Sequence, residues 1–184
     1  MLSVLIPFTE GVEEIELVAI VDILRRADIE VTMTSLDGQP VTGRSNMTIH
    51  ADKTLESITT ENWDMLVLPG GLPNAQLLGE SSKLKTITRY MAKQGKYIAA
   101  ICAAPKALAS FGLLKKKRVT SHPSVQQAIE QLEPSVMYAE DAVVLDGNII
   151  TSRGAGTAVA FALTLVAVLT SKETSESIQA AILA

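Results

Sequence analysis

The sequence predicts an α/β fold in which a mostly parallel sheet carries helices on both faces. Short apolar runs of strand type alternate along the chain with longer segments whose apolar residues recur at helical spacing. The 184 residues are 47% hydrophobic, which is enough for one sizeable core, so residues 1–184 are expected to form a single domain. In such folds, functional sites form beyond the carboxyl ends of the parallel strands.

The first half of the chain contains three predicted core strands, at 2–7, 30–36 and 64–68. Between them lies a helix at 13–27, with Ile15, Val18, Ala19, Ile23 and Leu24 expected on its apolar face. Residues 37–40 have the composition of a turn, and 41–50 are expected to form a small hairpin arm. Two helices follow at 74–79 and 82–94, the second capped by Ser81 or Ser82.

The second half continues the alternation. An apolar strand ends at Cys102 and a helix begins near Pro105, where the missing N–H of proline is tolerated. After a basic turn at 111–118, expected to be a solvated surface, a strand at 119–123 contains His122. The remaining elements are a helix at 125–132, strands at 135–138, 142–145 and 148–152, an apolar helix from Gly154 to about Leu169, and a weaker helix at 173–183.

Cys102, the only cysteine, lies on the predicted turn between strand and helix. A sharp turn of this kind presents a nucleophile at the end of a sheet strand. The unpaired N–H groups of a helix N-terminus would favour its thiolate form. The alternative is that Cys102 is a buried small hydrophobe, which is the commoner fate of a free cysteine.

Two other groups are expected to meet Cys102 at the strand ends. Glu16 lies among apolar residues, where partial burial would raise its carboxyl pKa and let it donate a hydrogen bond to a thiolate. His122 is a candidate base or proton shuttle, or else a capping histidine ahead of Pro123. Glu13 and Glu14 are interpreted as charges that suit a helix N-terminus.

Gly70 and Gly71 end the third core strand abruptly. Without side chains, their backbone N–H groups could approach a bound carbonyl oxygen or an oxidised sulfur, in the manner of an oxyanion hole. The alternative is an ordinary tight turn, for which glycine pairs are common.

Composition excludes several classes of function. A net charge of −4 and an aromatic content of 4% give no footprint for nucleic acid. One cysteine excludes an intrachain disulfide and a cysteine-rich zinc site, so a reducing compartment, the cytoplasm, is expected. The start of the chain lacks signal-peptide features, and the longest apolar run, 158–170, is too short to span a bilayer. Residues 154–157 lack a nucleotide-binding pattern, and His50 beside Asp52 lacks further metal ligands.

Five motifs, in order and spacing, resemble the DJ-1/PfpI superfamily, also called ThiJ. They are GVEEIE at 11–16, LPGG at 68–71, AAICAAP at 99–105, TSHP at 120–123 and TSRGAGT at 151–157. The match extends from about residue 2 to residue 170, and the chain is most similar to the DJ-1-like branch.

The resemblance implies a flavodoxin-like three-layer α/β/α sandwich with a nucleophile elbow, and a homodimer. It implies Cys102 as the nucleophile, Glu16 as its protonated hydrogen-bond partner, His122 beside it, and an oxyanion site from Gly70, Gly71 and the amide of Ala103. The implied activities need no cofactor: conversion of methylglyoxal or glyoxal to hydroxy acids (glyoxalase III, a lyase or hydrolase type), and deglycation of their adducts. An oxidative-stress sensor or redox-regulated chaperone, acting through Cys102 oxidation, is the alternative implied by the family.

The resemblance also implies roles for two arginines, Arg44 and Arg26. Family members often have Ser-Arg in the hairpin arm, whereas here the pair reads Arg44-Ser45, so an anion contact is displaced by one position. Arg26 matches a helix-one arginine that lies near the partner subunit's site in the family. The final helix is shorter than usual. A cysteine peptidase ranks last, because no carboxylate that could orient His122 is evident beside it in sequence.

Overall fold

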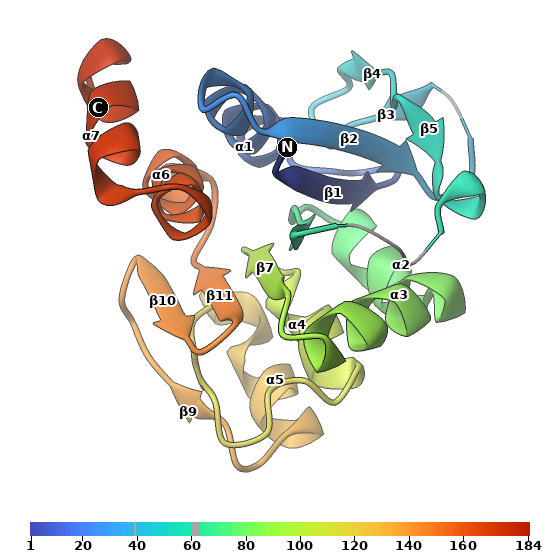
Figure 1. Ribbon diagram of the computed structural model, residues 1–184. Coiled ribbons are helices and arrows are strands. Elements are labelled where there is room, and N and C mark those ends of the chain that lie inside the picture. Colours follow the sequence, from blue (N-terminus) through green and yellow to red (C-terminus); the bar gives the residue numbers. More distant parts are fainter. Residues whose placement is uncertain (39, 60–62) are drawn as a thin grey trace.

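The computed structural model describes residues 1–38, 40–59 and 63–184. A seven-stranded sheet crosses this part of the chain in the order β10-β11-β7-β6-β1-β2-β5 (Figure 1). Neighbouring strands are parallel except for β10, which pairs antiparallel with β11. The strands are β1 (Ser3–Phe8), β2 (Glu30–Ser35), β5 (Lys53–Thr54), β6 (Met65–Leu68), β7 (Tyr97–Ile101), β10 (Val143–Asp146) and β11 (Ile149–Ser152).

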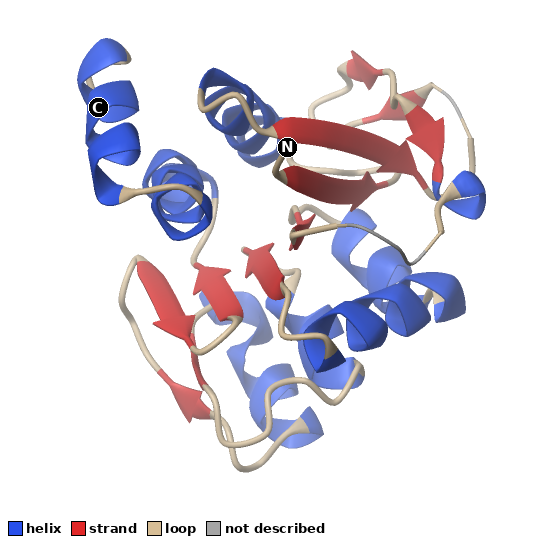
Figure 2. Ribbon diagram, in the orientation of Figure 1, coloured by secondary structure: helices blue, strands red, loops and turns tan. Residues whose placement is uncertain are grey.

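Helices cover both faces of this sheet, as Figure 2 shows, so the predicted α/β sandwich is confirmed. One face carries α1 (Glu14–Arg26) and α6 (Ala158–Leu169), with α7 (Lys172–Ala181) packed on α6. The other carries α2 (Asn74–Glu80), α3 (Ser82–Lys93), α4 (Pro105–Ser110) and α5 (Gln126–Leu132). Along β7, Ala99 and Ile101 pack toward the first layer, whereas Ile98 and Ala100 pack toward the second.

Smaller elements complete the described chain. β3 (Val41–Thr42) and β4 (Thr48–Ile49) form the predicted hairpin arm, and Ser81 caps α3 by accepting from the Leu84 N–H at 3.2 Å. The predicted turn at 37–40 includes Gln39, which lies outside the described residues. Three 3₁₀ turns lie at Leu55–Ser57, Pro123–Val125 and Ala155–Thr157. None of the helices in the described ranges has the length and apolarity that crossing a membrane requires.

The expected strand at 119–123 is mostly wrong. β8 contains only Arg118–Val119 and pairs with β9 (Met137–Tyr138). Beyond Val119, the Thr120 N–H donates to the side chain of Thr151, and the His122 N–H donates to the carbonyl of Cys102. These bonds take the chain out of the strand ladder and across the end of the sheet.

The predicted apolar face of α1 is also wrong in part. Ile15 is 60% exposed and Val18 is 55% exposed. The buried face of the helix instead contains Glu16 together with apolar residues at helical spacing. The side chains that pack against the sheet are Leu17, Ile20, Val21 and Leu24. The buried carboxyl therefore lies on the core face, and two apolar side chains point away from it.

Candidate active site

Cys102 occupies the sharp turn between β7 and α4. Its φ of +63° is the left-handed conformation, which costs a non-glycine residue free energy and persists only where surrounding structure holds it. Two backbone hydrogen bonds hold it here: the Cys102 N–H donates to the Ser152 carbonyl at 3.0 Å, and the His122 N–H donates to the Cys102 carbonyl at 2.8 Å. The predicted elbow is therefore present and is pinned from both sides.

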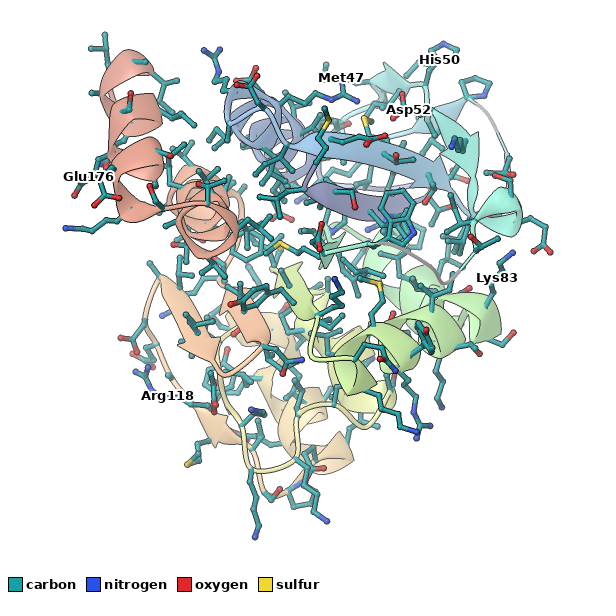
Figure 3. All side chains as sticks on the ribbon, viewed as in Figure 1. Met47, His50, Asp52, Lys83, Arg118 and Glu176 are labelled. Carbon is teal, nitrogen blue, oxygen red and sulfur yellow. The ribbon has the colours of Figure 1, made fainter. Side chains whose placement is uncertain are left out.

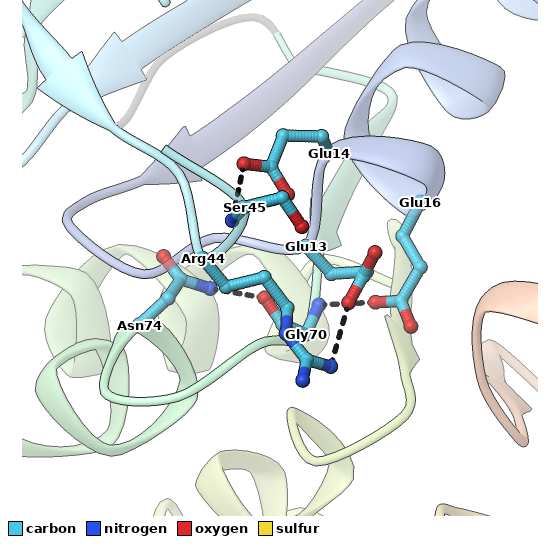
Figure 4. Close-up of polar contacts among 7 residues, drawn as sticks. All are labelled: Glu13, Glu14, Glu16, Arg44, Ser45, Gly70 and Asn74. Carbon is cyan, nitrogen blue, oxygen red and sulfur yellow. Dashed lines mark hydrogen bonds and ion pairs between the residues drawn. The ribbon is translucent and has the colours of Figure 1, made fainter. Parts of the chain in front are cut away.

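Gly70, after the end of β6, lets the cysteine and the glutamate approach each other. A Cβ atom on this residue would lie 2.6 Å from both Cys102 Cβ and Glu16 Oε2, closer than real Cβ contacts. Its N–H donates to Glu16 Oε2 at 2.8 Å, a bond drawn in Figure 4. Only glycine fits at this point.

Glu16 is completely buried. Burial raises the pKa of its carboxyl to about 7, against the lowering effect of the hydrogen bonds from Gly70 and from Cys102. The second carboxyl oxygen, Oε1, is buried without a hydrogen-bond partner at good geometry among the described residues. This oxygen is therefore free to hold a proton.

The thiol of Cys102 does not have the low pKa that the helix argument predicted. Burial, the charge of Glu16 and the hydrogen bond to Glu16 raise the pKa of Cys102 to about 12, and the amides of Gly71 and Ala103 offset this only in part. The helix that follows has only six residues, so its dipole is weak. Since either group ionises at the other's expense, the pair shares one negative charge near neutral pH.

Of the three predicted oxyanion donors, two are available. The backbone N–H groups of Gly71 and Ala103 donate to the Cys102 sulfur. The N–H of Gly70 is already engaged by Glu16, so Gly70 serves close packing rather than oxyanion binding.

His122 lies close to the sulfur of Cys102. A Cβ placed on Gly154 would lie 3.8 Å from His122 Cδ2 and 3.9 Å from Cys102 Sγ, so both side chains border the same space. His122 Nδ1 lies 2.8 Å from Ser124 Oγ and accepts the Ser124 N–H at 3.3 Å. Because Nδ1 is an acceptor, the neutral ring carries its proton on Nε2. Ser124 was not among the predicted site residues.

The hairpin arm contributes Arg44 to the cavity beside Cys102. Arg44 Nη1 pairs with Glu13 Oε2 at 3.0 Å, and the Ser45 N–H donates to Glu14 Oε1 at 2.7 Å (Figure 4). Glu13 and Glu14 lie at the start of α1, as predicted, and through these two contacts they also attach the hairpin arm to the helix. Arg26 pairs with Asp22 on the exposed side of α1 and is not among the residues that line the cavity beside Cys102.

Asn74, which was also not among the predicted site residues, holds the loop at Gly70 in place by hydrogen bonds. It is completely buried, its Oδ1 accepts the Thr9 N–H at 2.8 Å, and its Nδ2 donates to the carbonyls of Pro69 and Gly70. An asparagine at the start of a helix suggests a local cap, so nothing in the sequence indicated these longer contacts.

Together these groups surround a cavity of about 270 Å³. Its lining includes Glu13, Glu16, Arg44, Gly71, Cys102, Ala103, His122 and Ser124. The described residues contain no group of three or more His, Cys, Asp or Glu side chains placed to hold a metal ion. The arrangement offers a sulfur nucleophile, a buried proton carrier and two amides at one point.

Known proteins are similar to this chain in sequence. Residues 2–168 match the DJ-1/PfpI family. Protein dj-1beta of Drosophila melanogaster is 42% identical over 173 residues, covering 93% of this chain and 91% of that protein. The glutathione-independent glyoxalase DJR-1.2 of Caenorhabditis elegans is 33% identical over 92% of this chain and 89% of its own length. A deglycase of Pyrococcus horikoshii is 33% identical over 77% and 83%.

Solved structures agree with these relatives. Oxidized Toxoplasma gondii DJ-1 superposes with a TM-score of 0.93 at 36% identity, covering 100% of this chain and 98% of that one. Drosophila melanogaster DJ-1beta also superposes with a TM-score of 0.93, at 40% identity over 99% and 97%. The family match, residues 2–168, extends over nearly the whole chain and spans the positions of the elbow, the buried glutamate and the glycine pair. The chain therefore belongs to the DJ-1/PfpI family.

Proposed function

We propose that this protein is a cofactor-independent glyoxalase that converts methylglyoxal and glyoxal to hydroxy acids and acts on their early adducts as a deglycase. The observation that carries the proposal is the meeting of the Cys102 sulfur, the proton-holding carboxyl of Glu16 and the amides of Gly71 and Ala103. The relatives named glyoxalase and deglycase support this reaction class.

In the proposed mechanism, Cys102 gives its proton to Glu16 and the thiolate attacks the aldehyde carbon. The C=O bond opens to an oxyanion, which the amides of Gly71 and Ala103 stabilise until it takes the Glu16 proton to give a hemithioacetal. Glu16 and His122 then move two protons, one from the aldehyde carbon to the neighbouring carbonyl carbon and one from the new hydroxyl to the neighbouring carbonyl oxygen, which leaves a hydroxyacyl thioester. Water cleaves the C–S bond, releasing the hydroxy acid and the thiol. No electron acceptor is needed, because one carbon is oxidised as its neighbour is reduced.

The decisive experiment measures lactate formed from methylglyoxal, without glutathione, by the wild type and by Cys102→Ala. Lactate from the wild type alone is expected, and a Cys102→Ser protein should be inactive too. Normal turnover by either variant, or none by the wild type, would contradict the proposal. A cysteine peptidase is not favoured, since the described partners of His122 Nδ1 are a hydroxyl and a backbone N–H rather than a carboxylate.

A second candidate is an oxidative-stress sensor or redox-regulated chaperone. The sulfur is only partly buried, and the two amide N–H groups beside it could also donate hydrogen bonds to the oxygens of a sulfinate formed by peroxide. A structure similar to this chain is of an oxidized DJ-1. Mass spectrometry of the intact protein after mild peroxide tests this role: two added oxygens on Cys102 support it, and an unmodified cysteine argues against it.

We also propose that the protein is a homodimer joined through α1. Ile15 and Val18 are exposed on the side of the helix opposite the core, followed on the same side by Asp22 and Arg26. This placement suits the expected role of Arg26 near a partner's site. Light scattering should give twice the mass of one chain, falling to one chain in Ile15→Asp.

A further inference from the structure

Positive charge is concentrated in the middle of the chain. Residues 81–129 contain ten lysines and arginines and no aspartate or glutamate, whereas the other residues contain six and all twenty acids. The whole chain has a net charge of −4, so this segment forms a basic region on an acidic protein. Lys83 and Arg118, its first and last cations, are labelled in Figure 3.

A cavity of about 510 Å³ opens inside this region, which is a volume typical of small-molecule sites. It lies between the last turns of α3, the loop after α4 and the start of β11. Arg89, Lys93 and Lys117 provide three cations, and Tyr90, Leu113 and Ile149 contribute aromatic and apolar residues to the lining. The described lining contains no acidic side chain. This cavity is at the end of the sheet where β7 and β11 begin, whereas Cys102 follows the end of β7.

Two of the three cations lack a counter-charge. Lys117 Nζ lies 3.2 Å from Asp146 Oδ1, but neither Arg89 nor Lys93 forms an ion pair within the described ranges. The negative end of the α3 dipole accounts for Lys93, in the last turn. It does not account for Arg89 one turn earlier, because like charges four residues apart on a helix repel each other. An anion bound between them would remove this repulsion.

We propose that this cavity is a binding site for a small organic phosphate with a flat ring, the chemistry of a nucleoside monophosphate. The phosphate lies between Arg89 and Lys93, since a guanidinium matches phosphate oxygens in a bidentate manner and an ammonium adds a point charge. The ring packs on Tyr90, Leu113 and Ile149. The site uses no atom of the Cys102 cavity and does not depend on the function proposed for it.

Calorimetric titration of the wild-type protein at low ionic strength tests this, with AMP, adenosine and inorganic phosphate as separate probes. AMP is expected to bind saturably, and adenosine and phosphate at least about tenfold more weakly, because each lacks one half of the ligand. The double variant Arg89→Gln/Lys93→Gln should weaken AMP binding by about tenfold or more.

A matched control separates a built site from general attraction. Lys85→Gln/Lys116→Gln removes the same charge from the same basic region but alters no residue of the cavity lining, and it should change AMP affinity by less than about twofold. Circular dichroism confirms that both double variants fold. The proposal is overturned if the wild type does not bind AMP, if phosphate alone binds as tightly as AMP, or if both double variants lose affinity equally.

Discussion

The two ends of strand β7 are built in opposite ways. After its last residue, Cys102 adopts a strained backbone conformation beside a completely buried carboxyl, and glycine backbone fills the space between them. Before its first residue, Lys96 forms a half-exposed ion pair with Asp64, 2.9 Å apart. At the first end, Glu16 is shielded from solvent and shares one negative charge with Cys102. At the second end, the charges of Lys96 and Asp64 are partly exposed to solvent. The first end is therefore suited to chemistry and the second to binding.

The largest contrast is expected between alanine substitutions at the two ends. In Gly70→Ala the new methyl would overlap Cys102 and Glu16, so methylglyoxal turnover should fall by roughly 10²-fold or more as the reacting groups are displaced. The free energy of unfolding should fall by about 2–4 kcal/mol. Lactate assays and urea denaturation measure the two effects.

Gly95→Ala is the matched control at the other end. Gly95 has a positive φ, +74°, and a Cβ there would meet nothing within 4 Å. Alanine should cost only the left-handed conformation, about 1–2 kcal/mol, with turnover unchanged. Equal losses of activity in both variants would remove the distinction between the two ends.

Glu16→Gln should separate function from stability. An amide cannot take and return the thiol proton, so turnover is expected to fall by about 10²–10⁴-fold. The folded protein holds the Glu16 proton up to about pH 7, whereas the unfolded chain releases it near 4.5. The stability contributed by this carboxyl is therefore fully present below 4.5 and is lost as pH rises through about 7.

The shift in the pKa of Glu16 implies that the variant should be more stable than the wild type above pH 7, by up to about 3 kcal/mol. Urea denaturation at pH 4.5 and pH 8 measures the difference. A variant that is less stable than the wild type at pH 8 would show that the ionised carboxyl is better stabilised than its burial implies.

The pH dependence of the thiol sharpens this further. Only the form with a thiolate and a protonated Glu16 reacts, and its fraction is constant once the pair has lost one proton. Iodoacetamide alkylation of the wild type should therefore rise with pH up to about 7 and then level off.

Burial of the thiol remains in Glu16→Gln but the charge of Glu16 is gone, so the pKa of Cys102 should fall from about 12 while staying above its ordinary value of 9.0. Alkylation of the variant should keep rising between pH 7 and pH 9. Identical profiles for the two proteins would mean that Glu16 and Cys102 do not share a proton.

Periodicity and turn chemistry predicted the layers, the elbow and the meeting of Cys102 with Glu16, because these depend on local pattern and strand order. They could not predict which face of α1 is buried, since its apolar residues surround the helix and only packing selects Leu17 over Ile15. The raised thiol pKa was missed for a related reason: burial of the thiol, together with the neighbouring carboxyl of Glu16, outweighs the effect of a six-residue helix. Asn74 and Ser124 act through contacts that sequence spacing does not indicate.

Ser124→Ala is expected to have a several-fold effect. Losing the hydroxyl leaves the backbone N–H, at 3.3 Å, as the remaining described donor to His122 Nδ1, so the Nε2–H tautomer is less firmly held. Turnover should fall by roughly threefold, and nitrogen NMR should report more proton on Nδ1. His50, the other of the two histidines, is the internal control. An unchanged tautomer with reduced turnover would assign Ser124 to substrate contact instead.

The smallest effect is expected at the solvated end of β7, in Lys96→Met. Although burial opposes it, the hydrogen bonds from Lys96 and from the Ser3 N–H hold the pKa of Asp64 below its usual value of 3.8. The ion pair is partly exposed to solvent, so its loss should cost about 0.2–1 kcal/mol of unfolding free energy at pH 7, with no change in turnover. Because the pKa of Asp64 is lowered by folding, this contribution is present above 3.8 and disappears as pH falls below it. The unfolding free energies of the two proteins should therefore converge as pH falls below the folded-state pKa of Asp64. A difference that persists there would show that the Lys96 side chain stabilises this end by packing rather than by charge.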